Sequence, residues 1–305
     1  MKIHIYSKTK EGAWGGGNQF LKALRIGLIQ EGAYSECIHE ADAVIFNGYQ
    51  DIWRLVGYWF SAKRNKKIVY RLGPILHLHR GVKWKIVDYA VVCVARFFAD
   101  LVIFQSLWSY EWALKLGLPK NKKYCIILNA VDDSLFFRKD TKSILSQDKI
   151  QLIYSSWSSN MNKGFSYLAF LDTHLDFEKY EMTFVGNTPL SFEHICVVKP
   201  LSSKDLSDAL RRADIFISPV KDDACSNALL EALACGLPAV ALLSGGNKDV
   251  IQGGGLLFAT TEELLLGIDE VASHLSVYQD KIPKRTLRDA SLEYIRAIKS
   301  LHTTH

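Results

Sequence analysis

The sequence of 305 residues lacks any long uninterrupted hydrophobic run. Its longest apolar region, 86–104, is interrupted by Asp88, Arg96 and Asp100, so it has no stretch of the roughly 20 apolar residues that cross a bilayer as a helix. The first ten residues, MKIHIYSKTK, are charged from the second position onward and contain no apolar core of signal-peptide length. These absences predict a protein of the cytoplasm.

Paired cysteines are also missing. The six cysteines form no C-x-x-C pair and have no spacing typical of metal ligands. Most stand in apolar surroundings, as Cys93 does in YAVVCVARFF. We therefore expect buried free thiols in a reducing compartment and no bound metal. A repeat of short period is absent as well, which excludes a solenoid.

The composition is that of a folded globular protein, with 49% apolar and 23% charged residues, and the length is sufficient for two domains. The charge is unevenly spread. Residues 1–148 contain 22 Lys and Arg against 13 Asp and Glu, a net charge of +9, whereas the remainder contains 15 against 19, a net charge of −4. A negatively charged partner would be attracted to the first part of the chain.

Short apolar runs alternate with helical patterns along the whole chain. The runs expected to be strands are Lys2–Tyr6, Ala43–Phe46, Ile68–Tyr70, Leu101–Phe104, Tyr124–Leu128, Gln151–Tyr154, Glu181–Val185, Ile195–Val198, Ile215–Ser218 and Ala239–Leu242. The segments expected to be helices are Gln19–Gln30, Trp53–Lys63, Lys83–Phe98, Trp108–Leu116, Phe165–Thr173, Ser203–Arg211, Ser226–Ala234 and Arg285–His302. Because both faces of such strands must be covered, the pattern predicts an α/β fold with parallel sheets.

A polar segment without a clear period, Arg138–Lys149, divides this alternation. We therefore expect a first Rossmann-like, doubly wound domain at 1–148 on the acceptor side and a second at 149–284 for the donor. Residues 285–305 would form a terminal helix that packs back on the first domain. Two such domains would face each other across a cleft, where ligands of nucleotide type bind at strand ends and helix N-termini.

The most informative motif is DDACSNALLEALACGLPAV, residues 222–240. Asp223 precedes a predicted helix that Ser226 would cap, Asn227 follows the cap, and Glu231 lies eight residues after Asp223. One carboxylate could accept hydrogen bonds from the hydroxyls of a sugar and the other from those of a ribose, with phosphates at the helix N-terminus between them. On spacing alone, a surface loop before an ordinary amphipathic helix explains the motif equally well.

This motif resembles the acidic signature of glycosyltransferase family 4, two acids eight residues apart before a run of small residues. The chain resembles bacterial polysaccharide and lipopolysaccharide glycosyltransferases in particular, and the sequence SGGN at 244–247 is also similar to that subgroup. The resemblance is strong from 151 to about 258. It implies the GT-B fold and sugar transfer from a nucleotide-sugar donor to a glycan or lipid-linked acceptor, with retention of anomeric configuration. The family most often has Glu where this chain has Asp223.

A second motif, YSSWSSNMNKGF at 154–165, follows a predicted strand. Lys163 would offer a compact positive charge to a diphosphate. In family 4 an arginine about five residues earlier shares this task, and Ser158 stands there instead. The resemblance therefore assigns neutralisation of the leaving group to Lys163 and to helix dipoles. Asn187, after another predicted strand, matches a position near the ribose or nucleobase.

The glycine-rich sequence GAWGGGN at 12–18 follows the first strand but lacks the third glycine of the dinucleotide fingerprint, which argues against a dehydrogenase. Glycines there would allow close approach to a ligand, and the resemblance makes Gly16, Gly17 and Asn18 candidate donor contacts. A structural turn is the alternative. The segment RLGPILHLHR supplies further candidate contacts to acceptor or donor, although solvated loop side chains explain it as well. These four residues are Arg71, His77, His79 and Arg80.

Asp-x-Asp, the usual metal-binding motif of glycosyltransferases with the other main fold, is absent, so we expect a metal-free reaction without a cofactor. The basic run Lys63–Lys67, with Lys83, Lys85 and several tryptophans, could contact the inner face of a membrane or a lipid-linked acceptor, or be solvated. No nucleic-acid partner is expected. Two other functions stay open: a nucleotide-sugar epimerase or hydrolase of the same fold, and a non-catalytic sugar-nucleotide binding subunit.

Overall fold

The computed structural model describes residues 1–6, 16–61, 66–138 and 149–302. Its chain forms two compact units, the first from residues 1–130 and 286–305 and the second from 131–285. Sequence analysis placed the division at 148/149, but residues 131–138 belong to the second unit, where the Arg211 guanidinium donates to the Leu135 carbonyl (3.1 Å) and lies over the Phe137 ring.

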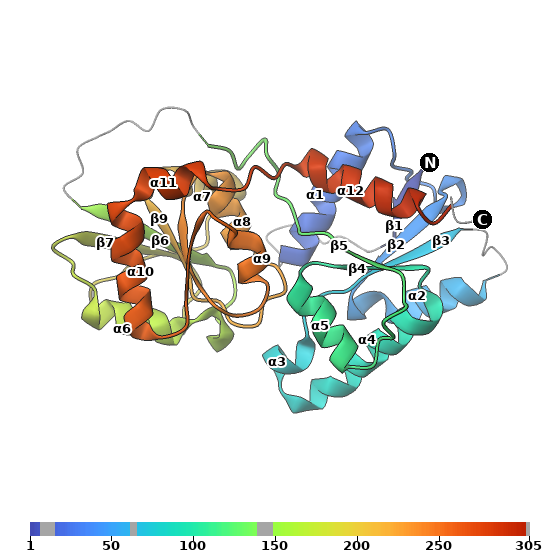
Figure 1. Ribbon diagram of the computed structural model, residues 1–305, viewed down its shortest axis with the longest axis horizontal. Coiled ribbons are helices and arrows are strands. Elements are labelled where there is room, and N and C mark those ends of the chain that lie inside the picture. The colour runs from blue at the N-terminus through green and yellow to red at the C-terminus, as the bar shows by residue number, and fades with distance from the viewer. Residues whose placement is uncertain (7–15, 62–65, 139–148, 303–305) are drawn as a thin grey trace. The chain divides into compact units, whose positions relative to one another are not determined.

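The first unit is built on a parallel sheet with the strand order β1-β2-β3-β4-β5 (Figure 1). Its strands are β1 (Ile3–Ile5), β2 (Ala43–Asn47), β3 (Lys67–Arg71), β4 (Leu101–Phe104) and β5 (Tyr124–Ile126). Its α-helices are α1 (Gly16–Gln30), α2 (Ile52–Phe60), α3 (Leu76–Arg80), α4 (Lys85–Phe98), α5 (Leu107–Lys115) and α12 (Leu287–Lys299).

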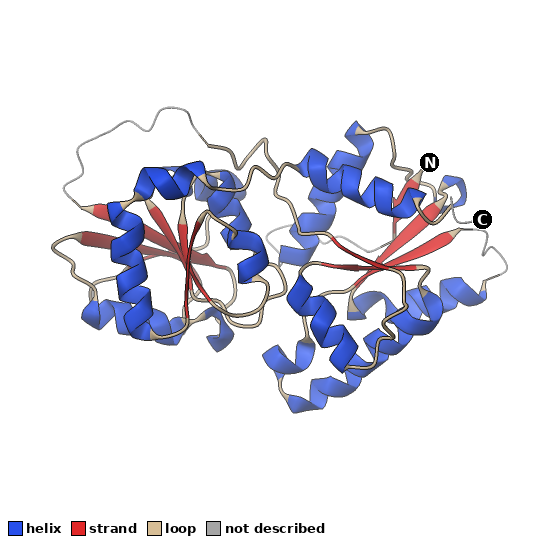
Figure 2. Cartoon of the chain, viewed as in Figure 1, coloured by secondary structure: helices blue, strands red, loops and turns tan. Residues whose placement is uncertain are grey.

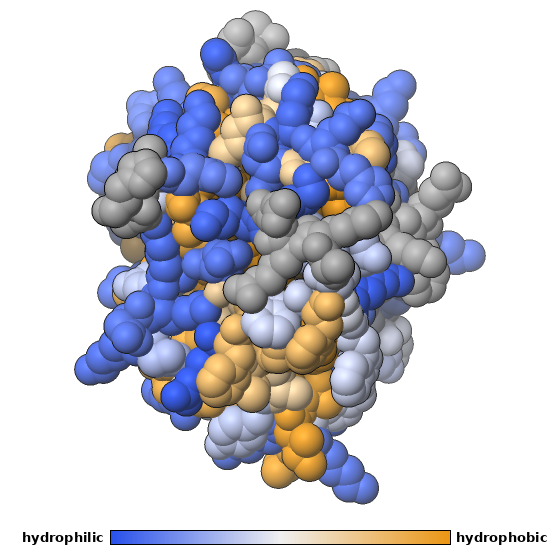
Figure 3. Space-filling view, turned by 90° about the vertical axis from the view of Figure 1, so that its right-hand side faces the viewer, coloured by the Kyte–Doolittle hydropathy of each residue, from blue (hydrophilic) through white to orange (hydrophobic). Residues whose placement is uncertain are grey.

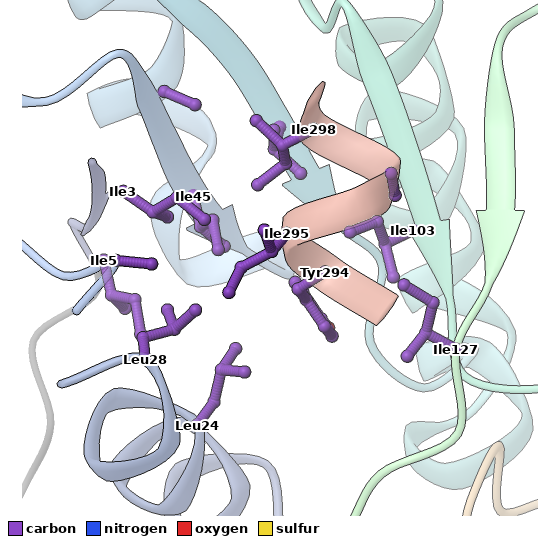
Figure 4. Close-up of a cluster of buried hydrophobic side chains, with 14 of the residues drawn as sticks. Ile3, Ile5, Leu24, Leu28, Ile45, Ile103, Ile127, Tyr294, Ile295 and Ile298 are labelled. Atoms are coloured by element: carbon purple, nitrogen blue, oxygen red, sulfur yellow. The ribbon is translucent and has the colours of Figure 1, made fainter. Parts of the chain in front are cut away.

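Alternate residues of each strand in this sheet face opposite sides. Ala43 and Ile45 of β2 point into the core beneath α1 and α12, whereas Val44 and Phe46 point into the core beneath α2, α4 and α5. The terminal helix α12 thus completes the first core, as Figure 4 shows for its residue Ile298, which is fully buried. Burial of such a side chain stabilises the unit by about 1.5–3 kcal/mol.

The second unit contains a six-stranded parallel sheet with the order β11-β10-β9-β6-β7-β8 (Figure 2). Its strands are β6 (Ile150–Ser156), β7 (Tyr180–Gly186), β8 (Cys196–Val198), β9 (Ile215–Ser218), β10 (Ala239–Leu242) and β11 (Gly255–Phe258). Its α-helices are α6 (Phe165–His174), α7 (Ser203–Arg212), α8 (Asn227–Ala234), α9 (Asn247–Ile251), α10 (Thr261–Ser273) and α11 (Leu275–Asp280). The prediction of two α/β domains with parallel sheets is confirmed.

Several local expectations need correction. The cysteines are free, but Cys37, Cys93 and Cys196 are exposed. Cys93 lies on the outer side of α4, which is apolar as well, Cys196 begins the edge strand β8, and Cys37 lies in the connection between α1 and β2. The segment 76–80, expected to be a loop, forms α3. The sequence reading also omitted α9, β11, α10 and α11. No helix among the described residues is long and apolar enough to cross a membrane.

Candidate functional site

The candidate site lies at one edge of the second sheet, where the parallel strands β6 and β9 end. These two strands are hydrogen-bonded neighbours, so the loops that follow them emerge side by side. The Lys221 N–H donates to the Asn162 carbonyl (2.8 Å) and joins the two loops directly. Lys163 and Ser226, which are 63 positions apart in the sequence, are thereby brought to the same edge of the sheet. This is the edge at which parallel α/β sheets bind their ligands.

The backbone around Lys163 is fixed from several sides. A short 3-10 helix, Met161–Lys163, is capped by Asn160, and the Lys163 carbonyl accepts from the Tyr154 hydroxyl (2.8 Å). Gly164 follows with φ = 82° and opens α6. A Cβ at Gly164 would lie 2.3 Å from the Pro219 carbonyl oxygen, so only glycine fits between the two loops. Lys163 is therefore held where these loops meet.

Lys163 and Asp223 form an ion pair. The Nζ atom of Lys163 lies 3.2 Å from Oδ2 of Asp223, and the two side chains are 27% and 26% exposed. The other carboxylate oxygen of Asp223 accepts from the backbone N–H of Cys225 (3.2 Å). Partial exposure makes both charged groups accessible from solvent, so a ligand at this edge could exchange with either partner.

The loop after β10 packs against the backbone of Asp223. The Gly246 N–H donates to the Asp223 carbonyl (2.8 Å), and Gly245, with φ = 59°, packs so closely that a Cβ would lie 2.2 Å from that carbonyl oxygen. Asp222 itself adopts φ = 57°, a conformation that non-glycine residues rarely take. Asn247 is fully buried and its Nδ2 donates to the Leu242 carbonyl (2.9 Å). The SGGN motif at 244–247 thus holds the backbone of Asp223 in place, a role that its resemblance to the family motif did not predict.

Helix α8 begins beside Asp223. The Ser226 side chain caps it by accepting from the Leu229 N–H (3.4 Å), as the sequence predicted, and Asn227 is its first residue. The free N–H groups of the first turn and the helix dipole together attract an anion at this end. Asp223 thus contacts Lys163 through one carboxylate oxygen and, through the other, the N–H of Cys225 just before the start of α8.

Glu231, in the middle of α8, is half-buried. Burial raises the pKa of its carboxyl group to about 8. Within the described residues its carboxylate receives no hydrogen bond, in contrast to that of Asp223. Once it has lost its proton, this carboxylate can accept hydrogen bonds from a ligand that brings its own hydroxyl donors.

Asn187 immediately follows β7, and its side chain is exposed. Its Nδ2 atom donates to the Trp157 carbonyl (2.8 Å), and its backbone N–H donates to the Ser156 carbonyl (3.3 Å). Asn187 therefore ties the loop after β7 to the loop after β6. Ser158, which stands in place of the family arginine, is exposed, and its Oγ accepts from the Asn160 N–H (3.2 Å).

The sequence-predicted residues of the first unit are placed differently. Gly16, Gly17 and Asn18 form the first turn of α1, so the backbone of Gly17 is helical and is not part of the structural turn that was the alternative to a donor contact. A Cβ at Gly17 would meet no atom within 4 Å. The rest of the glycine-rich loop, residues 12–15, lies outside the described residues.

Arg71 ends strand β3 and is only 1% exposed. Its guanidinium donates to Oδ1 of Asn47 (2.6 Å) and of Asn129 (2.7 Å) and lies 4.8 Å from the centre of the Phe20 ring. This is a buried cation that joins two strand ends and helix α1. Its burial favours a structural role over a direct contact with substrate.

The other three candidates of this segment belong to α3, not to a solvated loop. Nδ1 of His77 lies 2.7 Å from Oδ2 of the buried Asp88, which also accepts from the backbone N–H of Leu76 (2.8 Å) and of His77 (2.9 Å). His77 therefore helps to hold the first turn of α3 against Asp88. His79 is half-buried, and the exposed Arg80 lies over the rings of Trp84 and Tyr49.

A groove of about 500 Å³ lies elsewhere in the second unit, between α7 and the sheet. Thr183, Val198 and Asp205 are among its lining residues. None of the sequence-predicted site residues lines it. Among the described residues, no cluster of three or more His, Cys, Asp or Glu is arranged to hold a metal ion.

Part of the chain matches a known family model. Residues 158–274, which include the loop of Lys163 and the whole of α8, match the family model described as glycosyl transferases group 1. This match bears out the sequence prediction that the enzyme is a glycosyltransferase. No curated protein matches the chain.

Solved structures share the fold at low sequence identity. HepE of Anabaena in complex with UDP has a TM-score of 0.76 and 16% identity, with 98% of this chain and 100% of that chain covered. Sucrose-phosphate synthase of Thermosynechococcus elongatus has a TM-score of 0.71 and 15% identity, with 98% and 94% covered. The catalytic domain of starch synthase IV of Arabidopsis thaliana, bound to ADP and acarbose, has a TM-score of 0.67 and 12% identity, with 95% and 79% covered. The fold is therefore that of GT-B glycosyltransferases.

Proposed function

We propose that this chain transfers a sugar from a nucleoside-diphosphate sugar to a glycan or lipid-linked acceptor in the synthesis of a cell-surface polysaccharide. The observation that carries the proposal is the Lys163–Asp223 pair at the carboxyl edge of the second sheet, beside the N-terminus of α8. It lies within the segment that matches the glycosyltransferase family. HepE, which shares the fold, has been solved with UDP and glucose and with UDP-glucose, so UDP-sugars are the first donors to test.

In the proposed reaction the diphosphate of the donor takes the place of Asp223 as the partner of Lys163. Negative charge grows on the diphosphate as the bond between its oxygen and the sugar breaks, and Lys163 and the N-terminus of α8 stabilise that charge. In this exchange Oδ2 of Asp223 accepts a hydrogen bond from a sugar hydroxyl in place of the one from Lys163. The Cys225 N–H keeps the other oxygen of this carboxylate oriented.

Glu231 and Asn187 complete the donor site in this proposal. Glu231 accepts hydrogen bonds from the ribose hydroxyls. Its carboxylate receives no hydrogen bond from the described residues, so these hydroxyls would be its donors. Asn187 holds the loop of Trp157 near the nucleobase. Gly16, Gly17 and Asn18, in the first turn of α1, bind the donor from the first unit, and His79 and Arg80 remain candidate contacts for the acceptor.

Membership of glycosyltransferase family 4, retention of configuration and independence of metal are parts of the same proposal. They rest on the acidic motif at Asp223 and Glu231 and on the absence of Asp-x-Asp from the sequence. The reaction would take place in the cytoplasm, where nucleotide sugars are made, with lipid-linked acceptors reached at the inner face of the membrane.

The test begins with binding, because the acceptor is unknown. The melting temperature of the full chain is measured against UDP-, GDP-, ADP-, dTDP- and CMP-sugars, since a ligand that binds the native state raises it by mass action. We expect a rise with one nucleotide family. It should be weakened by Lys163→Ala and Asp223→Ala and unchanged by Lys204→Ala, which removes an exposed lysine of α7.

Turnover is then measured with the donor so identified and membrane extracts as the source of acceptor. Release of nucleoside diphosphate that depends on the extract supports transfer, and the anomeric configuration of the product tests retention. Turnover of the donor without any acceptor would indicate an epimerase or hydrolase instead. Binding without turnover under all these conditions would indicate a non-catalytic binding subunit and would overturn the proposal.

A further inference from the structure

Helix α4 of the first unit is apolar on two opposite sides. Its inner side, with Val92 and Ala95, is buried in the core beneath the sheet. Its outer side carries Ile86, Tyr89 and Phe97, which are 77%, 47% and 61% exposed. The spacing of 86, 89 and 97 places these three side chains along one stripe of the helix. A helix that is apolar all round is normally covered on both sides, and this one is covered on one side only.

Helix α2 extends the same surface. Trp53 and Phe60, seven residues apart, are 84% and 71% exposed and lie on its outer side. The Phe60 ring packs against the ring of Trp59 (centroids 4.9 Å apart) and that of Phe98 in α4 (6.2 Å), so the two helices present one continuous surface. We call it the α2–α4 face, made of Trp53, Phe60, Val82, Ile86, Tyr89 and Phe97.

Figure 3 looks onto this side of the first unit, where hydrophobic side chains gather over α2 and α4. An apolar patch of this kind on a folded protein marks a surface that binds a partner. Aromatic residues dominate it, and large aromatic side chains are favoured at the interface between water and lipid.

The charge around the α2–α4 face has one sign. Among the described residues from 52 to 99, the exposed charged side chains are all basic: Arg80, Lys83, Lys85 and Arg96. Lys83 and Lys85 are exposed at the start of α4, and Arg96 lies over the Phe97 ring, 5.1 Å from its centre. Asp88, the one acidic residue between 52 and 99, is 3% exposed, and its carboxylate is hydrogen-bonded to His77 of α3. The partner of this face must therefore be both apolar and negatively charged.

We infer that the α2–α4 face binds the surface of a lipid bilayer that contains anionic lipids. Its aromatic and aliphatic side chains would enter the boundary between headgroups and acyl chains, and Lys83, Lys85 and Arg96 would contact lipid phosphates. A second copy of this chain fits less well, because two such faces would bring cations against cations. The inference goes beyond the proposed transfer reaction and does not depend on it.

The test is sedimentation of the full chain with vesicles, without donor or acceptor. Vesicles of phosphatidylcholine alone are compared with vesicles of equal parts phosphatidylcholine and phosphatidylglycerol. We expect binding to the anionic vesicles that weakens with added salt. The double variant Trp53→Ser, Phe97→Ser should lose it, and the pair Lys83→Glu, Lys85→Glu should lower the partition coefficient by roughly tenfold or more.

Matched controls come from the second unit. Leu266→Ser removes an apolar side chain of α10 that is 68% exposed, and Lys204→Glu with Lys248→Glu reverses two exposed lysines there. These variants should bind anionic vesicles like the unchanged protein. Circular dichroism and melting temperature confirm that every variant is folded, which the exposure of the substituted residues leads us to expect.

Three outcomes would overturn the inference. The unchanged protein could fail to sediment with anionic vesicles, or the α2–α4 variants could bind them as well as the controls do. Sedimentation velocity could instead show a dimer that the Trp53→Ser, Phe97→Ser variant abolishes, which would assign the face to a second copy of the chain. Because no sugar donor is present, these results test only the contact with a membrane, and the transfer of the sugar is tested separately by the donor-binding and turnover measurements.

Discussion

Each of the two sheets has a cation near the carboxyl end of a parallel strand, and the two cations differ in exposure and in the charge of their hydrogen-bond partners. In the first unit, Arg71 is 1% exposed and donates to the side chains of Asn47 and Asn129. In the second unit, Lys163 is 27% exposed and paired with Asp223. Arg71 is bonded to two neutral amides, whereas Lys163 is partly exposed to solvent and is paired with a carboxylate that a ligand can replace.

The difference shows that a basic residue after a parallel strand is not by itself a binding residue. Two amide acceptors, the buried Asn129 and the partly buried Asn47, make Arg71 part of the core, where its removal would leave unsatisfied polar groups. Lys163 makes one partly exposed ion pair, which contributes little to folding and can be exchanged for a ligand phosphate. The comparison therefore predicts a loss of function at one site and a loss of stability at the other.

The largest effect is expected from Lys163→Ala. Loss of a cation that stabilises the leaving diphosphate should lower kcat/KM by about 100- to 1000-fold, or roughly 3–4 kcal/mol. The free energy of unfolding should change by less than about 1 kcal/mol, because the ion pair is partly exposed. Steady-state kinetics and urea denaturation measure the two quantities. Unchanged kinetics would remove Lys163 from the mechanism, and Lys163→Arg should recover part of the rate.

Arg71→Met should show the reverse. The variant keeps an apolar stem but leaves the Oδ1 atoms of Asn47 and Asn129 without their donors, so the free energy of unfolding should fall by about 3 kcal/mol. Arg80→Met is the matched control, since Arg80 is exposed and only lies over two aromatic rings. It should cost less than about 1 kcal/mol. Equal stability of the two variants in urea would contradict the structural role of Arg71.

Glu231 should make donor binding dependent on pH. Burial raises the pKa of this carboxyl group to about 8, so it is largely protonated at pH 7 in the free protein. If its carboxylate accepts hydrogen bonds from ribose hydroxyls, binding must release a proton, and affinity should rise by up to about fivefold between pH 7 and pH 8. Calorimetry in buffers of different ionisation enthalpy measures that proton. Glu231→Gln should abolish the release.

The same shift has a consequence for the protein without donor. A raised pKa means that the folded state binds the proton more tightly than the unfolded state does. The free energy of unfolding should therefore decrease as the pH rises from the ordinary carboxyl pKa, near 4.5, to about 8. Glu231→Gln should flatten this part of the stability profile. A profile that is the same in both proteins would show that Glu231 is solvated in the free protein.

Local patterns predicted much of the second unit. Apolar runs bounded by polar residues gave strands such as β9, and the sequence of Ser226 before an apolar run gave the start of α8. Both depend on residues close in sequence, which is why a single sequence was sufficient. The pairing of Lys163 with Asp223, 60 residues apart, followed only once both loops were assigned to adjacent parallel strands.

The first unit shows where sequence reasoning stops. Arg71 is enclosed by Asn47 and Asn129, which are 24 and 58 residues away, and no local signal marks them as its partners. Helix α3 has five residues, too few for a periodic pattern, and the carboxylate of Asp88 completes its start from a different helix. The exposure of Cys93 was missed because an apolar sequence does not reveal which side of α4 faces the core.

The smallest effect is expected at Asn187, where the two loops at the site are joined by one side-chain hydrogen bond. Asn187→Ala removes the bond from Nδ2 to the Trp157 carbonyl but keeps the backbone bond to Ser156, so one of these two bonds between Asn187 and the end of β6 and its loop is lost. We expect donor affinity to fall by about 1 kcal/mol, or roughly fivefold, with little change in stability because the site is exposed. Thr188→Ala, one residue further along, is the control, since its hydroxyl bonds only within its own turn. If both substitutions weaken the donor equally, the loop after β7 acts through its general order, and Asn187 has no specific part in positioning Trp157.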